Sequence, residues 1–315
     1  MASPNSEGGS IGEGALAWDD ADRAALVAMM RVTAKNTEWS TVTEQVMERG
    51  GARLLWEDDH PPGLFGAGEE SGELDRAARD VERWKSAPLR FHTFMDRSYP
   101  EQLRSVRRVP PVVFTWGRMV PRENGICVVG SRDPSERALE FARRVAVGLT
   151  EAGIAVISGL AKGIDTAAHR ATLDAGGRTV AVLGNGVDRA YPQENRELQA
   201  EISQRGMLLT HFLPEYPPSR WSFPARNATM SAYGLATVIV EANEQSGTRI
   251  QAREAVRHGR SVILNVTVAQ ATTWGRAMVG TPNVHIASSP EEAIAQAHRI
   301  IAHRAMVSRL LDPIA

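Results

Sequence analysis

The chain has 315 residues, of which 43% are hydrophobic and 23% charged, and its formal net charge at pH 7 is −1. This composition is that of a folded globular protein. Because no run approaches the roughly 20 apolar residues of a membrane span and no signal peptide is recognisable, we expect a cytoplasmic protein without membrane contacts. The near-neutral charge excludes a bulk attraction to nucleic acid, so DNA binding would require a local cluster of cations.

The N-terminal part of the chain predicts helices rather than a sheet. Residues 1–14 are small, polar and rich in Gly and Ser, so we expect them to be disordered. Residues 15–60 carry apolar side chains at helical spacing, which predicts a small helical domain. Pro and Gly residues then interrupt this pattern, and residues 61–90 are expected to be a linker that includes one helix, at about 74–84.

Residues 91–303 are expected to form a second, larger domain, followed by a tail at 304–315. After an extended lead-in, short apolar runs alternate with helical segments, which is typical of βαβ units in a parallel sheet. We expect strands at 125–130, 154–158, 179–183, 207–210, 237–241, 261–266 and 284–286. We expect helices at 136–151, 166–175, 193–205, 231–235 (the end of a longer piece), 248–258 and 291–301. The strands are continuous apolar runs, which predicts helices on both faces: an α/β fold with a Rossmann-like, doubly wound, mostly parallel sheet.

Glycines and polar side chains follow the first three predicted strands. Ligands bind beyond the carboxyl ends of strands in such sheets, where glycines let the backbone approach and helix N-termini present free N–H groups. After the first strand, Gly130, Ser131 and Arg132 offer amides, a hydroxyl and a guanidinium to a phosphate or carboxylate. The corresponding residues after the second and third strands are Ser158, Gly159, Lys162, Gly163, Gly184, Asn185 and Gly186.

Several residues near these loops have a simpler structural interpretation. Asp165 stands where a helix N-cap belongs, and His169 is expected to be a satisfied or solvent-facing histidine. Cys127 lies in an apolar run and is expected to be a buried thiol. A single cysteine excludes a disulfide within the chain and a thiolate metal cluster. The third loop lacks the last glycine of GxGxxG and no Walker motif is present, so we expect neither a cofactor nor a metal.

A second group of candidate residues follows a proline-rich loop. Phe223, Arg226 and Asn227 combine an aromatic ring that can stack on a base with a guanidinium and an amide. A packed Phe beside a salt-bridged Arg is the structural alternative. Further along, arginines at 249, 253 and 257 form a stripe at helical spacing, which is more typical of a solvated helix face.

Six blocks of this sequence, in order, resemble the DNA-processing protein A family, also called DprA or Smf. The similarity covers about residues 92–266 and is carried by blocks at 129–132, 158–169, 181–188, 191–195, 223–227 and 240–248. The N-terminal helical module resembles the sterile-alpha-motif-like (SAM-like) domain that often precedes the family's core.

The resemblance implies an extended Rossmann domain that binds single-stranded DNA. It also implies loading of the RecA recombinase during uptake of transforming DNA, and a homodimer. Carried over by motif, the DNA pocket would include Gly130, Ser131, Arg132, Lys162, Gly163, Phe223, Arg226 and Asn227, and Ser246, Gly247 and Thr248 belong to the last matching block.

Departures from the family pattern indicate a divergent member. Ala228 stands where a second basic residue is usual. Where the family tends to have Ser-Gly-Ser followed by Thr-Ala, this chain reads Ser246-Gly247-Thr248-Arg249-Ile250-Gln251-Ala252. The family usually has a Pro-Gly turn after the sixth strand, whereas here the mostly apolar run continues from Leu264 to Val268. The segment that follows differs from the family's closing segment, and we expect the C-terminal winged-helix module of many members to be missing.

Two other functions remain open at this point. A related Rossmann family removes ribose phosphate from nucleotide monophosphates, using Pro-Gly-Gly-x-Gly-Thr-x-x-Glu. Here Gln251 replaces the acid, and an amide can neither take up nor release the proton, so we expect no catalytic residues and no enzyme. The second alternative is a sensor of a nucleotide-derived small ligand, because a pocket for one nucleotide of a strand would also suit a free nucleotide.

Overall fold

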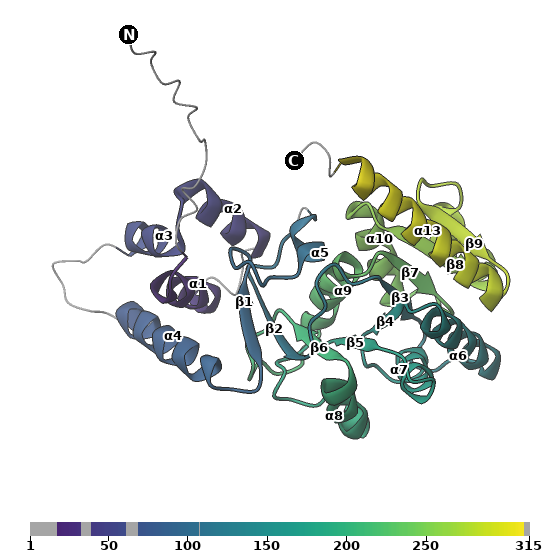
Figure 1. Cartoon of the computed structure of the whole chain (residues 1–315), viewed down its shortest axis with the longest axis horizontal. Coiled ribbons are helices and arrows are strands. Elements are labelled where there is room, and N and C mark those ends of the chain that lie inside the picture. Colours follow the sequence, from purple (N-terminus) through teal and green to yellow (C-terminus); the bar gives the residue numbers. More distant parts are fainter. Residues whose placement is uncertain (1–17, 33–38, 61–68, 107, 312–315) are drawn as a thin grey trace, which may run out of the picture. The chain divides into compact units, whose positions relative to one another are not determined.

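The computed structural model describes residues 18–32, 39–60, 69–106 and 108–311 (Figure 1). The predicted disorder of residues 1–14 lies outside the described residues. The chain divides into two compact units, Met1–Arg83 and Trp84–Ala315. None of the described helices is long and apolar enough to cross a membrane.

The first unit contains helices and no described strand. Its elements are α1 (Asp20–Val32), α2 (Trp39–Arg49), α3 (Ala52–Asp59) and most of α4 (Glu69–Lys85). The buried faces of these helices include Leu26, Val46, Trp56 and Val81, as expected from apolar residues at helical spacing. The helix predicted at 74–84 is therefore part of a longer one.

The second unit is built on one nine-stranded sheet. Its strands are β1 (Arg90–Thr93), β2 (Val112–Gly117), β3 (Gly125–Val129), β4 (Ala155–Ser158), β5 (Thr179–Val182), β6 (Met207–Thr210), β7 (Ala236–Ile239), β8 (Ser261–Asn265) and β9 (Val284–Ala287). The strand order is β1-β2-β6-β5-β4-β3-β7-β8-β9. All pairs from β6 to β9 are parallel, and β1 and β2 add an antiparallel edge. The predicted α/β class and mostly parallel sheet are confirmed.

Helices cover both faces of this sheet. They are α5 (Glu101–Arg104), α6 (Glu136–Glu151), α7 (Ile164–Asp174), η1 (Gln193–Asn195), α8 (Arg196–Arg205), α9 (Ser222–Tyr233), α10 (Thr248–Arg257), α11 (Val266–Ala271), α12 (Thr273–Met278) and α13 (Pro290–Leu311). On one face, α6, α7 and α13 share a core with the strands, in which Val145 and Ala297 pack near Ile126 and Val238. On the other face, α9 and α10 pack together and against the central strands (Figure 1).

The strand order reverses between β3 and β7. From β3 the chain winds outward through β4, β5 and β6, then crosses back through α9 to β7 on the other side of β3. The loops that follow β3 and β7 therefore diverge to opposite faces, which leaves a crevice at the carboxyl ends of these two strands.

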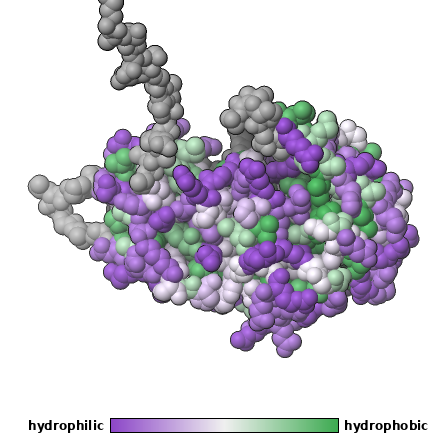
Figure 2. All heavy atoms as spheres, viewed as in Figure 1, coloured by the Kyte–Doolittle hydropathy of each residue, from purple (hydrophilic) through white to green (hydrophobic). Residues whose placement is uncertain are grey.

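Several predicted boundaries differ from the structure. The strand predicted at 261–266 ends at Asn265, because the Asn265 carboxamide accepts from the Thr267 N–H at 3.1 Å and caps α11. The helix predicted at 231–235 ends earlier, since α9 stops at Tyr233. The last helix, predicted at 291–301, continues to Leu311, and Figure 2 shows hydrophobic residues at the surface near its end, where Met306 and Leu310 are exposed.

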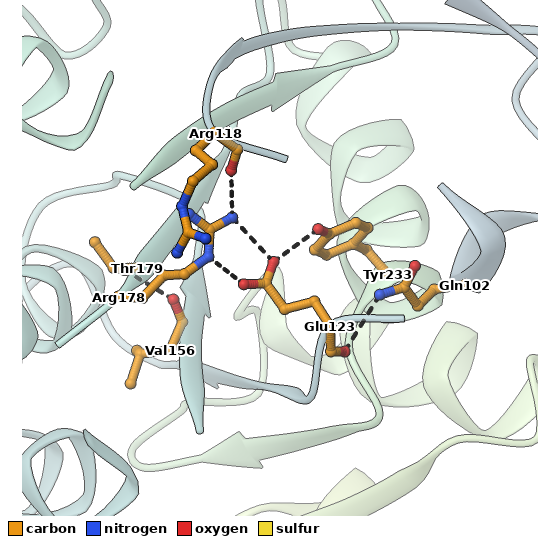
Figure 3. Close-up of polar contacts among 7 residues, drawn as sticks. All are labelled: Gln102, Arg118, Glu123, Val156, Arg178, Thr179 and Tyr233. Atoms are coloured by element: carbon orange, nitrogen blue, oxygen red, sulfur yellow. Dashed lines mark hydrogen bonds and ion pairs between the residues drawn. The ribbon is translucent and has the colours of Figure 1, made fainter. Parts of the chain in front are cut away.

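A buried polar cluster lies at the amino-terminal ends of the central strands, at the other end of the sheet from the crevice (Figure 3). The Glu123 carboxylate, just before β3, forms an ion pair with Arg178, just before β5, and accepts from the Tyr233 hydroxyl at 2.9 Å. Arg178 also donates to the Arg118 carbonyl at 2.6 Å, and Gln102 donates to the Glu123 carbonyl at 3.2 Å. These contacts join α9 to the segments just before β3 and β5, so we regard this end of the sheet as structural.

Candidate nucleic-acid interface

A pocket of about 450 Å³ opens at the carboxyl ends of β3 and β7, where the strand order reverses. We call it the switch-point pocket. It is lined by Val129, Gly130, Ser131, Arg132, Asp133, Ala161, Asp165, Arg226, Asn227, Met230, Asn243, Gln245, Ser246, Gly247, Thr248 and Gln251. It thus joins the loop after β3, the first part of α9 and the start of α10, which are far apart in the sequence.

A smaller pocket of about 60 Å³ lies beside it, and we call it the aromatic pocket. Its lining residues are Arg132, Gly159, Ala161, Lys162, Gly184, Asn185, Tyr191, Pro192, Phe223 and Arg226. The rings of Tyr191 and Phe223 have centres 5.4 Å apart and form its aromatic side. Arg132, Ala161 and Arg226 line both pockets, so the two form one continuous polar and aromatic surface.

Arg132 is the exposed cation between the two pockets. It lies in the loop after β3, and its guanidinium carbon is 5.3 Å from the centre of the Phe223 ring. No carboxylate of the described residues forms an ion pair with it. A guanidinium held against an aromatic ring, with its N–H groups unused, can bind a phosphate with two parallel hydrogen bonds.

Arg226 has a different environment from Arg132. It lies in α9 and is 4% exposed, and its Nη1 donates to the carbonyls of Gly159 at 2.5 Å and Val182 at 3.0 Å. Burial lowers its pKa, whereas the nearby Asp165 carboxylate raises it. Its main contacts therefore bind the loop after β4 to the end of β5, and only part of the guanidinium faces the pockets.

Lys162 is exposed but already paired. Its ammonium lies 2.5 Å from the Glu194 carboxylate, and both side chains are about half exposed. An incoming phosphate would have to compete with Glu194 for this cation, although exposed pairs of this kind are weak. Lys162 lines the aromatic pocket and does not line the switch-point pocket.

The glycines at the strand ends make room for protein neighbours. A Cβ atom at Gly159 would overlap the Arg226 guanidinium, and one at Gly184 would lie 2.7 Å from the Phe223 ring. A Cβ atom at Gly186 would overlap the Pro214 carbonyl. Gly163 has φ +76° and precedes the first residue of α7, a conformation that side-chain-bearing residues rarely adopt. These contacts explain the glycines without a ligand.

Three predicted site residues line neither pocket: Ser158, Gly163 and Gly186. Ser158 is fully buried and its hydroxyl donates to the Val128 carbonyl at 2.7 Å. Asn185 lines the aromatic pocket, but its amide already donates to the carbonyls of Gly186 and Arg189. Fewer residues can therefore contact an anion than the glycine and polar residues at the strand ends suggest.

The N-cap prediction for Asp165 is wrong. Helix α7 begins at Ile164, two residues before the predicted start at 166, and the Asp165 carboxylate instead accepts from the N–H groups of Gly159 and Ala161 at 3.1 and 3.3 Å. Burial raises the pKa of Asp165, and the Arg226 charge opposes this. The carboxylate thus fixes the loop after β4 that separates the two pockets.

Cys127 is a buried thiol as predicted, and His169 is buried with a hydrogen-bonding partner for Nδ1 but none for Nε2 among the described residues. His169 is buried, with Nδ1 2.6 Å from the Thr179 hydroxyl, and burial lowers its pKa to about 3. The Cys127 thiol is buried and donates to the Met230 carbonyl, and burial raises its pKa to about 12. Neither side chain can act in the pockets. Among the described residues, no group of three or more His, Cys, Asp or Glu side chains could hold a metal ion.

The start of α10 brings the last predicted residues into the switch-point pocket. The Asn227 amide donates to the Gly247 carbonyl at 3.2 Å, and the hydroxyls of Ser246 and Thr248 lie 2.8 Å apart. The Asn227–Gly247 contact joins α9 to the start of α10 across the reversal of strand order. Gly130, Ser131 and Arg132 face this pair from the loop after β3.

The sequence patterns did not identify Tyr191 and Gln251 as site residues. Tyr191 lies in the matching block at 191–195, and that block could have identified it. Gln251 lies three residues after Thr248 in α10, and residues at this spacing share one helix face. The position of Thr248 could therefore have indicated Gln251.

Known proteins match this chain mainly over its second unit. The family model described as DNA recombination-mediator protein A matches residues 90–308. Protein Smf of Synechocystis sp. is 36% identical over 187 residues, which cover 58% of this chain and 47% of that protein. The DNA processing protein DprA of Bacillus subtilis is 34% identical over 168 residues, covering 53% and 57%. The chain thus spans about half the length of the curated relatives it matches.

Solved structures share the fold. The X-ray structure of DNA processing protein A from Streptococcus pneumoniae superimposes with a TM-score of 0.66 at 24% identity, covering 88% of this chain and 95% of that chain. DNA processing protein A from Helicobacter pylori, a structure concerned with its single-stranded DNA binding mode, gives a TM-score of 0.58 at 20% identity, covering 67% and 96%.

Proposed function

This chain belongs to the DNA recombination-mediator protein A family, and from that premise we propose that it binds single-stranded DNA across the switch-point and aromatic pockets. The observation that carries this proposal is the position of Arg132 between the two pockets, exposed and against the Phe223 ring. A phosphate bound by Arg132 would leave the bases on its two sides facing the two pockets. The Helicobacter pylori relative binds single-stranded DNA, which supports the same ligand here.

The aromatic pocket accounts for a preference for single strands. Base stacking on Phe223 and Tyr191 would tolerate any sequence, because every base has an aromatic face. A duplex hides these faces and offers mainly its phosphates to the protein. With a formal net charge of −1, the chain has no general attraction to a duplex.

We also propose the wider role that the resemblance to the family implies. This role is the processing of incoming DNA during transformation and recombination in the cytoplasm, with RecA as a protein partner and a homodimer as the working form. We assign the DNA site to the second domain, residues 91–303, with the small helical domain at 15–60 and the helix-bearing linker at 61–90 outside it.

We further propose that the chain binds DNA without altering it chemically. The two carboxylates of the switch-point pocket are Asp133 and Asp165, and Asp165 already accepts two backbone N–H groups. Gln251 stands where the related nucleotide hydrolases have their acid, and a carboxamide cannot exchange the proton. Release of base from a nucleotide monophosphate by the unmodified chain would contradict this proposal.

A titration at several salt concentrations tests the DNA-binding proposal. Single-stranded and double-stranded DNA of equal length would be compared by gel shift, and we expect the single strand to bind more tightly at each salt concentration. Arg132→Ala should weaken binding and flatten the slope of log K against log salt by about 0.7, the increment for one phosphate. Arg299→Ala removes the same charge from the exposed side of α13 and should leave the slope unchanged. Equal affinities for both DNAs, or equal slopes for both variants, would contradict the proposal.

A further inference from the structure

We propose that Gln251 reads the edge of a nucleobase that enters the switch-point pocket. The proposal rests on the proposed binding of single-stranded DNA and adds to it a base preference that stacking and phosphate contacts do not provide. Stacking tolerates every base and a phosphate carries no sequence information, so a preference would have to come from a hydrogen-bonding group within a pocket.

Gln251 is a buried polar side chain without a hydrogen-bonding partner. It lines the switch-point pocket and is 1% exposed, and neither its Oε1 nor its Nε2 has a partner among the described residues. Buried amide groups are almost always hydrogen-bonded, because leaving them unpaired is costly. A ligand that supplies both a donor and an acceptor would remove this cost, and this is a reason for the pocket to bind one.

The chemistry of the carboxamide selects the kind of ligand. Its donor and acceptor lie side by side in one plane, and a nucleobase edge presents a donor and an acceptor with the same planar arrangement. Glutamine reads adenine in this bidentate way in protein–DNA complexes. A phosphate would satisfy Nε2 alone, because it offers only acceptors at neutral pH and would leave Oε1 unpaired.

The rest of the pocket fits a base better than a phosphate. Its volume of about 450 Å³ lies within the range of about 300–1,000 Å³ that is common for small-molecule sites. The carboxylates of Asp133 and Asp165 line it and would repel a phosphate. Val129 and Met230 are buried and apolar and can contact the faces of a ring. Arg132 lines the same pocket, so it can hold the phosphate of the nucleotide whose base enters.

Two variants separate the hydrogen-bonding atoms of Gln251 from its size. Gln251→Thr gives a shorter side chain with one hydroxyl in place of the carboxamide. Gln251→Met keeps the length of the side chain and removes both hydrogen-bonding atoms. We expect Gln251→Met not to lower the midpoint of thermal unfolding, because it removes only polar atoms that have no partner in the described protein.

The experiment compares base preference with overall binding. The full chain, Gln251→Met, Gln251→Thr and the control Gln204→Met, which alters an exposed glutamine of α8, would be titrated with homopolymeric dA, dC and dT strands of one length. A strand of the same length with abasic residues measures the phosphate contribution. Deoxyadenosine monophosphate measures binding of a free nucleotide.

We expect the unmodified chain to prefer one homopolymer by at least about fivefold, with dA the tightest, because one bidentate contact discriminates between bases by roughly that factor or more. Both Gln251 variants should lose this preference and keep their affinity for the abasic strand, whereas Gln204→Met should keep both. Equal affinities of the unmodified chain for all homopolymers, or an unchanged preference in both variants, would overturn the assignment of Gln251.

The same measurements separate this proposal from the proposed function. If the abasic strand and all homopolymers fail to bind while the monophosphate binds in a Gln251-dependent way, the base-reading role stands and the strand-binding function is wrong. If the abasic strand binds and base preference is absent, the strand-binding function stands and the role of Gln251 is wrong. If no probe binds, both are wrong.

Discussion

The guanidinium of Arg132 and the ring of Phe223 form a cation–aromatic pair, with the guanidinium carbon 5.3 Å from the ring centre. The pair joins a loop after β3 to the first turn of α9, and Gly184 leaves the space that the ring occupies. Such contacts hold a guanidinium in place without using its N–H groups. The pair therefore presents a charged group and an aromatic face side by side, as a nucleotide requires.

Removing the Phe223 ring should weaken binding without changing its salt dependence. We expect Phe223→Ala to cost roughly 1–3 kcal/mol of affinity for single-stranded DNA, because a stacked base loses its partner while the phosphate contact remains. The measurement is a fluorescence anisotropy titration at several salt concentrations. Trp221→Ala is the matched control, since Trp221 is 84% exposed and lines neither pocket. A larger loss of affinity for Trp221→Ala than for Phe223→Ala would contradict the assignment of base stacking to Phe223.

Truncating Arg226 should affect folding more than DNA binding. Arg226→Ala leaves the Gly159 and Val182 carbonyls and the Asp165 carboxylate without this cation, and breaking a buried charged contact of this kind costs about 3–5 kcal/mol. Urea denaturation would show this as a lower midpoint. Arg253→Ala, on the exposed side of α10, should shift the midpoint little. Unchanged stability of Arg226→Ala, with a salt slope flattened as in Arg132→Ala, would instead make Arg226 a phosphate ligand.

A methyl group at position 159 should destabilise the loop after β4. Its Cβ atom would overlap the Arg226 guanidinium, so Gly159→Ala must displace a buried side chain, and overpacking of this kind typically costs about 1–3 kcal/mol. Gly247→Ala is the control, because the nearest atom to its Cβ is 3.8 Å away and its φ is −60°. Thermal unfolding of both variants measures the difference. If Gly159→Ala were as stable as Gly247→Ala, the close approach of Arg226 would be wrong.

The buried histidine His169 should make the protein less stable in acid. Burial lowers its pKa from 6.5 to about 3. Above pH 6.5 the His169 imidazole is neutral in both the folded and the unfolded chain, so it does not make the free energy of unfolding depend on pH there. As the pH falls from 6.5 toward 3, the unfolded chain binds a proton that the folded chain does not, and the free energy of unfolding decreases by up to about 1.4 kcal/mol per pH unit.

Substitution of His169 should therefore make the acid limb of the stability curve shallower. His169→Gln removes one titrating group, and urea denaturation at a series of pH values below 6.5 should give a slope smaller by up to about 1.4 kcal/mol per pH unit. The absolute stability is expected to fall as well, because the contact with Thr179 is altered. His303→Gln, in the exposed part of α13, serves as the control for loss of a histidine. If the free energy of unfolding depended on pH in the same way in both variants, the lowered pKa of His169 in the folded protein would be wrong.

The sequence by itself determined the fold class and the family. Apolar runs and helical spacing are local features, and they located the parallel strands of the second unit because each strand must bury its own side chains. The residues after β3 were also identified correctly as lining a pocket, since the carboxyl end of a central parallel strand faces the ligand side in any sheet of this kind. The boundary at Asn265 was missed because one side-chain cap outweighed an apolar run.

Only the tertiary structure decided which polar groups are free. Arg132 and Arg226 look alike in sequence, each a cation beside small residues. Arg226 is buried against Gly159, which is 67 residues away, whereas Arg132 is exposed. Gln251 looks like an ordinary helix residue, and it is unpaired because α9, α10 and the loop after β3 meet around it. Burial and hydrogen bonding depend on contacts between segments distant in the chain, and the pattern of a single segment carries no record of them.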